Sequence, residues 1–213
     1  MYCPAHFAED RVEILQALMR AHPFVTLASR ADGELVADHL PLQLSPDGRR
    51  LLGHVARANP LWKMAAGQEV LAVFQGPQAY VSPSWYATKR EHGRAVPTWN
   101  YVVVHAHGRL AAIEDPKRLR AMLDELVDHH EAEFAEPWCV GDAPSDYIDK
   151  MLAAIVGIEI TITTLAGKWK VSQNQPAANR AGIIVGLRQR GTDVGDAMAA
   201  LVAAVPGEPS RNG

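Results

Sequence analysis

The sequence has few cysteines and no long apolar run, and each shortage narrows the class of protein. Its two cysteines, Cys3 and Cys139, have no CxxC partner and show no pattern of a disulfide framework. No apolar run approaches the roughly 18 residues of a membrane span, and the first residues lack the apolar core of a signal peptide. These absences predict a soluble cytoplasmic protein of a reducing compartment, without a membrane partner.

The chain also lacks an excess of basic over acidic residues. The formal net charge is −3, so the chain as a whole lacks the cationic surplus of most nucleic-acid-binding proteins. The cations are unevenly distributed, because residues 160–192 contain no acidic residue and carry a formal charge of +5. The five cations are Lys168, Lys170, Arg180, Arg188 and Arg190. This segment could meet a phosphate of a cofactor or of DNA, or it could be a solvated basic surface.

Apolar residues make up 48% of the chain, which is enough for a sizeable core in one large domain or two small ones. Alternating and β-branched segments predict about seven strands, the first two joined by a turn at Asp32-Gly33. Apolar runs at residues 70–75 and 79–82 are interpreted as two strands, because a Gly-Pro pair between them indicates a turn. The longest strand is expected at residues 96–113.

Helical periodicity predicts helices at residues 7–22, 116–134 and 145–155, and a helical tail follows residue 177. Antiparallel strands with helices inserted late are typical of a small closed or split β-barrel. We therefore expect an α+β fold, mainly β with added helices. The most economical organisation is one split-barrel domain over residues 1–213.

A possible anion site lies at residues 53–62, Gly-His-Val-Ala-Arg-Ala-Asn-Pro-Leu-Trp, where a strand gives way to a short helix. Asn59 can cap that helix, and Pro60 suits its first position, where a missing N–H costs nothing. The guanidinium of Arg57 beside unpaired backbone N–H groups would form a cradle for phosphate. Alternatively, Arg57 lies on the surface and Asn59 only caps the helix.

Polar residues also occur in the longest expected strand and in the segment at residues 168–174. Because side chains alternate along a strand, Thr98 and Asn100 share one face with valines, and Trp99 lies on the other. Polar groups among apolar strands need a ligand or an interface to satisfy them. Both segments are therefore candidate parts of a binding site.

The three polar segments together offer the groups that a phosphorylated planar cofactor needs. Positive charge comes from Arg57 and Lys170, and stacking surface comes from Trp99 and Trp169. The amides suited to the edge of a heteroaromatic ring are Asn100, Gln173 and Asn174. We expect these groups to converge on one ligand.

Five blocks along the chain resemble the signature of the PaiB family, which is described as FMN-binding negative transcriptional regulators. The blocks are residues 1–7, 53–60, 76–86, 96–101 and 170–174. In fold the family is similar to split-barrel flavoproteins such as pyridoxamine phosphate oxidase. The resemblance implies a homodimer that holds FMN at its subunit interface. It also implies a repressor of genes such as those for sporulation and secreted proteases in spore formers.

The resemblance implies roles for individual residues as well. Arg57 would bind the flavin phosphate, and the long strand would present Asn100 or Thr98 to the ring. The other positions expected at the cofactor are His54 and Val55 along the ring, and Asn59, Trp99, Trp169, Lys170, Ser172, Gln173 and Asn174. Where the oxidase has a second basic phosphate ligand directly after the arginine, this sequence has Ala58.

The regulator assignment has an alternative, a flavin-dependent oxidoreductase or a haem-handling enzyme on the same barrel. The late helices are alanine-rich and no helix-turn-helix is recognisable, so DNA would be bound directly in another way or through a partner. His105 and His107 share a strand face and His129 and His130 are adjacent, but no third ligand has zinc-like spacing. No Ser/His/Asp order or carboxylate pair argues for hydrolysis, so no catalytic or metal-binding residue is assigned.

Overall fold

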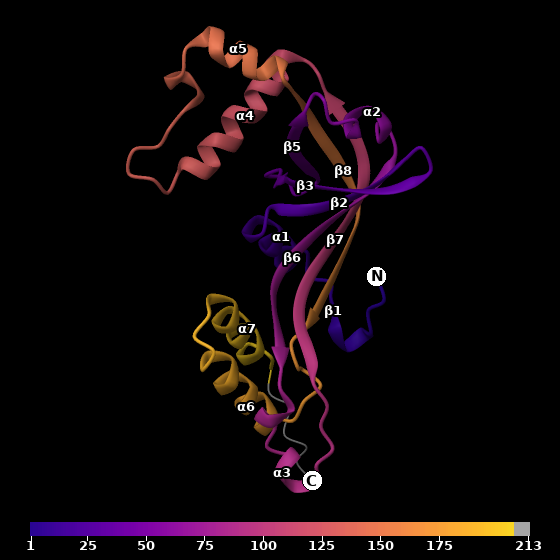
Figure 1. Ribbon diagram of the computed structural model, residues 1–213, viewed down its shortest axis with the longest axis vertical. Coiled ribbons are helices and arrows are strands. Elements are labelled where there is room, and N and C mark those ends of the chain that lie inside the picture. Colours follow the sequence, from indigo (N-terminus) through magenta and orange to yellow (C-terminus); the bar gives the residue numbers. More distant parts are fainter. Residues whose placement is uncertain (207–213) are drawn as a thin grey trace. The chain divides into compact units, whose positions relative to one another are not determined.

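The computed structural model describes residues 1–206, which divide into two units (Figure 1). The first unit combines Met1–Leu15, Gln75–Val104 and the described part of Ala166–Gly213. The second unit combines Gln16–Phe74 with His105–Leu165. Each unit is thus assembled from segments that are far apart in the sequence. The organisation as one domain stays a prediction.

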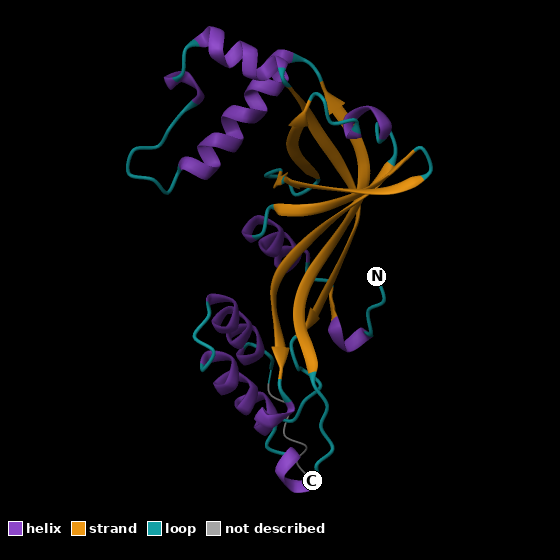
Figure 2. Cartoon of the chain, viewed as in Figure 1, coloured by secondary structure: helices purple, strands orange, loops and turns teal. Residues whose placement is uncertain are grey.

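Eight strands form one antiparallel sheet, drawn as orange arrows in Figure 2. They are Ala8–Glu9 (β1), Phe24–Ala31 (β2), Glu34–Pro41 (β3), Gln43–Leu44 (β4), Arg50–Ala56 (β5), Glu69–Val81 (β6), Thr98–Ile113 (β7) and Ile155–Lys170 (β8). The strand order is β3-β2-β6-β7-β8-β5-β4, and β1 pairs with β8. A sheet of this kind with attached helices confirms the expected α+β class.

Seven α-helices accompany the sheet within the described residues. They are Val12–Ala21 (α1), Leu61–Met64 (α2), Lys89–His92 (α3), Pro116–Glu131 (α4), Ser145–Ala153 (α5), Ala177–Arg188 (α6) and Asp193–Ala203 (α7). Helices α4 and α5 belong to the second unit, whereas α6 and α7 pack against each other in the first (Figure 1). None of the helices in residues 1–206 has the length and apolar character to cross a bilayer.

Local chemistry accounts for the elements that the sequence predicted well. Asp32 and Gly33 both have positive φ, 51° and 86°, as a two-residue hairpin turn requires, and the pair Ala31 and Glu34 flanks them in register. The carboxylate of Asp115 accepts a hydrogen bond from Arg118 N at 2.8 Å and so caps α4. These residues confirm the predicted hairpin and the predicted start of α4.

Two predicted element boundaries are wrong. The turn expected between residues 70–75 and 79–82 does not form, because β6 continues through the Gly-Pro pair. Its alternation of buried residues shifts by one between Gly76 and Ala79, as happens at a β-bulge, which tolerates proline. The first helix begins at Val12 instead of residue 7, because Ala8 and its neighbour pair with β8 as a short strand.

Each unit buries apolar side chains from its strands or helices. In the second unit the residues with at most 1% exposure include Leu27, Leu51, Phe74, Leu110, Ile158 and Ile160. In the first unit they include Val81, Val102, Val104, Ile183, Leu187 and Met198. Burial of each such large side chain stabilises the fold by about 1.5–3 kcal/mol. The strands and helices that these residues anchor also carry the polar residues described below.

Candidate functional site

A polar pocket of about 260 Å³ in the first unit gathers residues from two of the predicted segments. We call it the unit 1 pocket. Its wall includes Thr98 and Asn100 of β7, and Lys170, Ser172 and Asn174 at and beyond the end of β8. Five of the predicted cofactor-binding residues therefore meet at one place, although the two segments lie about 70 residues apart in the sequence.

A buried hydrogen-bonded pair forms one wall of the unit 1 pocket. Nδ2 of Asn100 donates to Oγ of Ser172 at 2.9 Å, and the same hydroxyl lies 3.2 Å from Oδ1 of Asn100. The two residues are only 1% and 4% exposed. Ser172 has a φ of 61°, in the left-handed region that residues other than glycine rarely adopt. Strained positions of this kind gather at binding sites, where the surrounding structure enforces them.

Positive charge dominates the unit 1 pocket. The ammonium group of Lys170 donates to Oγ1 of Thr98 and, at 2.8 Å, to the carbonyl oxygen of Trp99. Lysine has three donors, so one remains for a ligand. Arg94 adds a second cation to the wall, and the described lining residues include no carboxylate. The pocket is therefore suited to an anionic group.

Sequence reasoning missed Arg94 and Asn179 as parts of this pocket. Asn179, 2% exposed, accepts a hydrogen bond from Thr88 N at 3.1 Å and donates to Oε1 of Gln175 at 3.0 Å. It therefore fixes the start of α6 to the segment that follows β6. The sequence signal for Asn179 was a single asparagine in an alanine-rich helix. Arg94 lies in a polar loop with no periodicity, so no pattern distinguished it.

The predicted tryptophans do not line the unit 1 pocket. Trp99 follows the strand alternation onto the opposite face of β7 from Asn100 and is more than half exposed. Its ring meets that of Tyr80 edge to face, with centroids 6.0 Å apart. Trp169 is half-buried, and its carbonyl oxygen accepts a hydrogen bond from the side chain of Gln173. Gln173 therefore shapes the turn after β8.

Arg57, in the second unit, is engaged by the C-terminal end of α5. Its Nε donates to the carbonyl oxygen of Ala153 at 2.8 Å, and its Nη2 donates to that of Ile155 at 2.9 Å. Its Nη1 lies 3.4 Å from the carboxylate of Glu114. Cations stabilise the last carbonyl groups of a helix, so this guanidinium acts as a cap for α5. Its predicted role at a phosphate stays a prediction.

Asn59 lies one residue before Pro60, which is the N-cap residue of the short helix α2. Its Oδ1 accepts a hydrogen bond from Leu61 N, the first residue of α2, at 2.8 Å. Its Nδ2 donates to the carboxylate of Asp38 at 2.7 Å. The side chains of Asn59 and Arg57 thus have separate partners, and a carboxylate lies beside the start of α2, where the anion cradle was expected.

The remaining two predicted residues lie on β5. Val55 is buried in the core of the second unit. The Nδ1 atom of His54 is buried and has no hydrogen-bond partner among the described residues. Burial lowers the pKa of His54, because the charged imidazolium loses its hydration. His54 is therefore held as a neutral ring.

The histidines considered for haem or metal do not form a cluster. Burial lowers the pKa of His105, and the rings of His129 and His130 stand 5.3 Å apart on α4. Within residues 1–206, no three histidine, cysteine, aspartate or glutamate side chains are arranged to hold a metal ion. The unit 1 pocket is thus the place where five of the twelve predicted residues meet.

Comparison with known proteins gives a family and a fold. The family model described as "Putative FMN-binding domain" matches residues 1–164. An uncharacterised protein of Emericella nidulans is 34% identical over 241 aligned positions, covering 95% of this chain and 96% of that protein. The Protease synthase and sporulation protein PAI 2 of Bacillus subtilis is 31% identical, again over 95% and 96%.

Two solved structures share the fold at low sequence identity. A flavocytochrome from Azotobacter vinelandii is 18% identical, with a TM-score of 0.54 over 77% of this chain and 69% of that one. An FAD and heme binding protein from Mycobacterium smegmatis is 21% identical, with a TM-score of 0.53 over 76% and 71%. At these identities the likeness shows the fold alone, an antiparallel split barrel with helices.

Proposed function

The chain belongs to the PaiB family of FMN-binding domains, and on that premise we propose that it binds FMN and acts as a negative transcriptional regulator. The flavin part is supported by the family match over residues 1–164. The regulatory part is supported by the name of the relative from Bacillus subtilis, a protease synthase and sporulation protein.

The unit 1 pocket is the observation that carries the flavin proposal. Lys170 and Arg94 supply positive charge for a phosphate, and no described lining residue opposes it with a carboxylate. The fixed amide of Asn100 offers a donor and an acceptor to the edge of a ring. When bound, FMN would supply redox chemistry, and these residues would bind and orient it.

The size of the pocket supports the homodimer that the family resemblance implies. Its volume of about 260 Å³ is below the roughly 300–1,000 Å³ that is typical of small-molecule and cofactor sites. One chain would therefore hold part of the cofactor, and a second chain would cover the rest. The exposed aromatic pair of Trp99 and Tyr80 is the kind of surface that protein interfaces favour.

The C-terminal helices favour regulation through a partner over direct reading of DNA. A four-residue connection with Gly191 at positive φ joins α6 to α7, which is the chain path of a helix-turn-helix. However, α7 begins with Asp193 and Asp196 and contains no lysine or arginine. A helix that enters the major groove approaches phosphates and needs cations, so α7 is unsuited to that position.

Titration with FMN, followed by flavin fluorescence, tests the binding part. Wild-type protein should bind FMN, and Lys170→Met should bind it about tenfold or more weakly, because a charged hydrogen bond to phosphate contributes about 1.5–3 kcal/mol. Lys150→Met is the matched control, since that lysine is exposed on α5, and its affinity should equal that of the wild type. Absence of FMN binding by the wild type, or equal affinities in all three proteins, would contradict the proposal.

A second pair of assays separates the regulator from an oxidoreductase. A gel-shift assay against the promoter of the protein's own operon, with and without cell extract, tests DNA binding directly and through a partner. An NAD(P)H oxidation assay with added FMN tests for turnover. Retardation without turnover supports the regulator, whereas turnover without retardation supports the oxidoreductase.

A further inference from the structure

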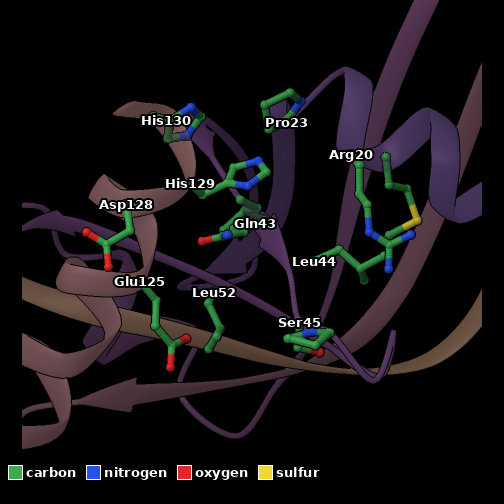
Figure 3. A pocket seen from close by; sticks show the side chains of 13 residues that line it. Arg20, Pro23, Gln43, Leu44, Ser45, Leu52, Glu125, Asp128, His129 and His130 are labelled. Atoms are coloured by element: carbon green, nitrogen blue, oxygen red, sulfur yellow. The ribbon is translucent and has the colours of Figure 1, made fainter. Parts of the chain in front are cut away.

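The second unit contains a larger pocket that none of the predicted cofactor-binding residues lines (Figure 3). We call it the unit 2 pocket. Its volume of about 520 Å³ lies in the range of small-molecule sites. Its apolar lining comes from Met19 of α1, Leu42 and Leu44 around β4, and Leu52 of β5. Three of these four side chains are buried, so the apolar wall is preformed.

Charged groups stand at two sides of this apolar wall. Glu125 and Asp128 come from α4, three residues apart and hence on one face of the helix. Arg20 comes from the end of α1, and Figure 3 shows it across the pocket from the two acids. The pocket thus has a negative side and a positive side, and Gln43 and His129 lie with the apolar side chains between them (Figure 3).

These charges are available to a ligand. Within residues 1–206, neither Glu125 nor Asp128 takes part in a salt bridge or a side-chain hydrogen bond. The guanidinium of Arg20 has one long contact, 3.5 Å, to Oε1 of Gln16 on its own helix. Most of its donors are therefore free to form the paired hydrogen bonds that arginine makes with a carboxylate.

We propose that the unit 2 pocket binds a small zwitterion with an apolar body, a short apolar peptide whose ammonium and carboxylate groups lie on different residues. The ligand's ammonium group faces Glu125 and Asp128, its carboxylate faces Arg20, and its side chains cover the leucines. A simple amine would leave Arg20 unpaired, and a simple carboxylate or a phosphate would face two acids. Only a molecule with both charges matches both sides of the pocket.

This site goes beyond the proposed flavin function and does not depend on it. The residues that line the unit 2 pocket are all in the second unit, whereas the unit 1 pocket is formed by residues of the first. In a regulator, a separate small-molecule pocket of this kind would sense a metabolite. The binding test can therefore be carried out with flavin affinity as an independent readout.

Isothermal titration calorimetry with four probes tests the chemistry of the ligand. The probes are leucine, leucyl-leucine, N-acetyl-leucyl-leucine and leucyl-leucine amide. Leucyl-leucine should bind, whereas leucine should bind more weakly, because its two charges sit on one carbon atom and cannot reach both sides of the pocket at once. If leucyl-leucine binds, removing either of its charges should weaken binding about tenfold. Absence of leucyl-leucine binding at millimolar concentration, or equal binding of the acetylated peptide or of the amide, would overturn the proposal.

Variants locate the two charges. The double variant Glu125→Gln/Asp128→Asn should weaken binding of the best zwitterion about tenfold, and so should Arg20→Gln. All three side chains lie on the surface, so the fold should persist.

Glu133→Gln and Arg49→Gln are matched controls outside the pocket and should bind the zwitterion like the wild type. FMN affinity should be the same in every variant. Zwitterion binding that survives both pocket variants would place the ligand elsewhere and overturn the assignment.

Discussion

Replacement of Arg57 distinguishes the two roles that this residue could have. In the structure its guanidinium donates to the carbonyl oxygens of Ala153, the last residue of α5, and of Ile155, the first residue of β8. Arg57→Ala removes both donors and leaves the two carbonyl groups without them. If this cap is the main role of Arg57, the variant should lower the free energy of unfolding, whether or not flavin is present.

The magnitude follows from the two hydrogen bonds and their exposure. A hydrogen bond to a charged group contributes about 1.5–3 kcal/mol when it is well shielded. The side chain of Arg57 is 40% exposed, so water replaces part of each bond and screens the charge. We therefore expect a loss of about 1–2 kcal/mol in total. For a chain of this size, that loss corresponds to a drop of roughly 2–8 °C in the unfolding midpoint.

Thermal unfolding of the flavin-free protein, followed by circular dichroism, measures this loss. Glu114→Gln is the control, because it removes only an exposed ion pair at 3.4 Å and should cost no more than about 0.5 kcal/mol. An Arg57→Ala midpoint equal to that of the wild type would refute the capping role. If FMN affinity then falls about tenfold or more in the same variant, Arg57 acts at the phosphate as the sequence predicted.

Three further changes test other parts of the account. Gly182→Ala would make its Cβ atom clash with the carbonyl oxygen of Trp85, so chemical denaturation should show a free energy of unfolding lower by about 2–3 kcal/mol. An unchanged midpoint would be inconsistent with this packing. Asp115→Ala removes the cap of α4 and should cost about 1 kcal/mol in the same assay, whereas wild-type stability would show that the cap is dispensable. Burial lowers the pKa of His54 below its ordinary value of 6.5. As the pH drops below 6.5, the unfolded chain therefore binds a proton at this residue that the folded chain does not, and the free energy of unfolding should fall. His54→Gln should remove part of that fall, and an identical pH profile would argue against a buried neutral ring.

The features that the sequence predicted correctly depend on short-range chemistry. The turn at Asp32-Gly33 and the cap at Asp115 are each specified by neighbouring residues, so a local pattern is sufficient. The alternation of side chains along β7 was also predicted from the sequence, and it placed Thr98 and Asn100 on one face and Trp99 on the other. That alternation is why part of the candidate site could be predicted.

The features that sequence reasoning missed depend on distant partners. The partners of Arg57 lie 96 and 98 residues further along the chain, and no local pattern indicates that α5 ends beside it. The Gly-Pro pair in β6 has the composition of a turn, yet the strand continues through it. Arg94 joins the unit 1 pocket from a loop without periodicity. In each case tertiary contacts decide the outcome.

The most direct test of the central claim compares the affinities of FMN and riboflavin, which differ by the phosphate. If Lys170 meets the phosphate in the unit 1 pocket, wild-type protein should prefer FMN, and Lys170→Met should reduce that preference about tenfold. Riboflavin affinity should be the same in both proteins. A preference for FMN that is unchanged by Lys170→Met would contradict the claim.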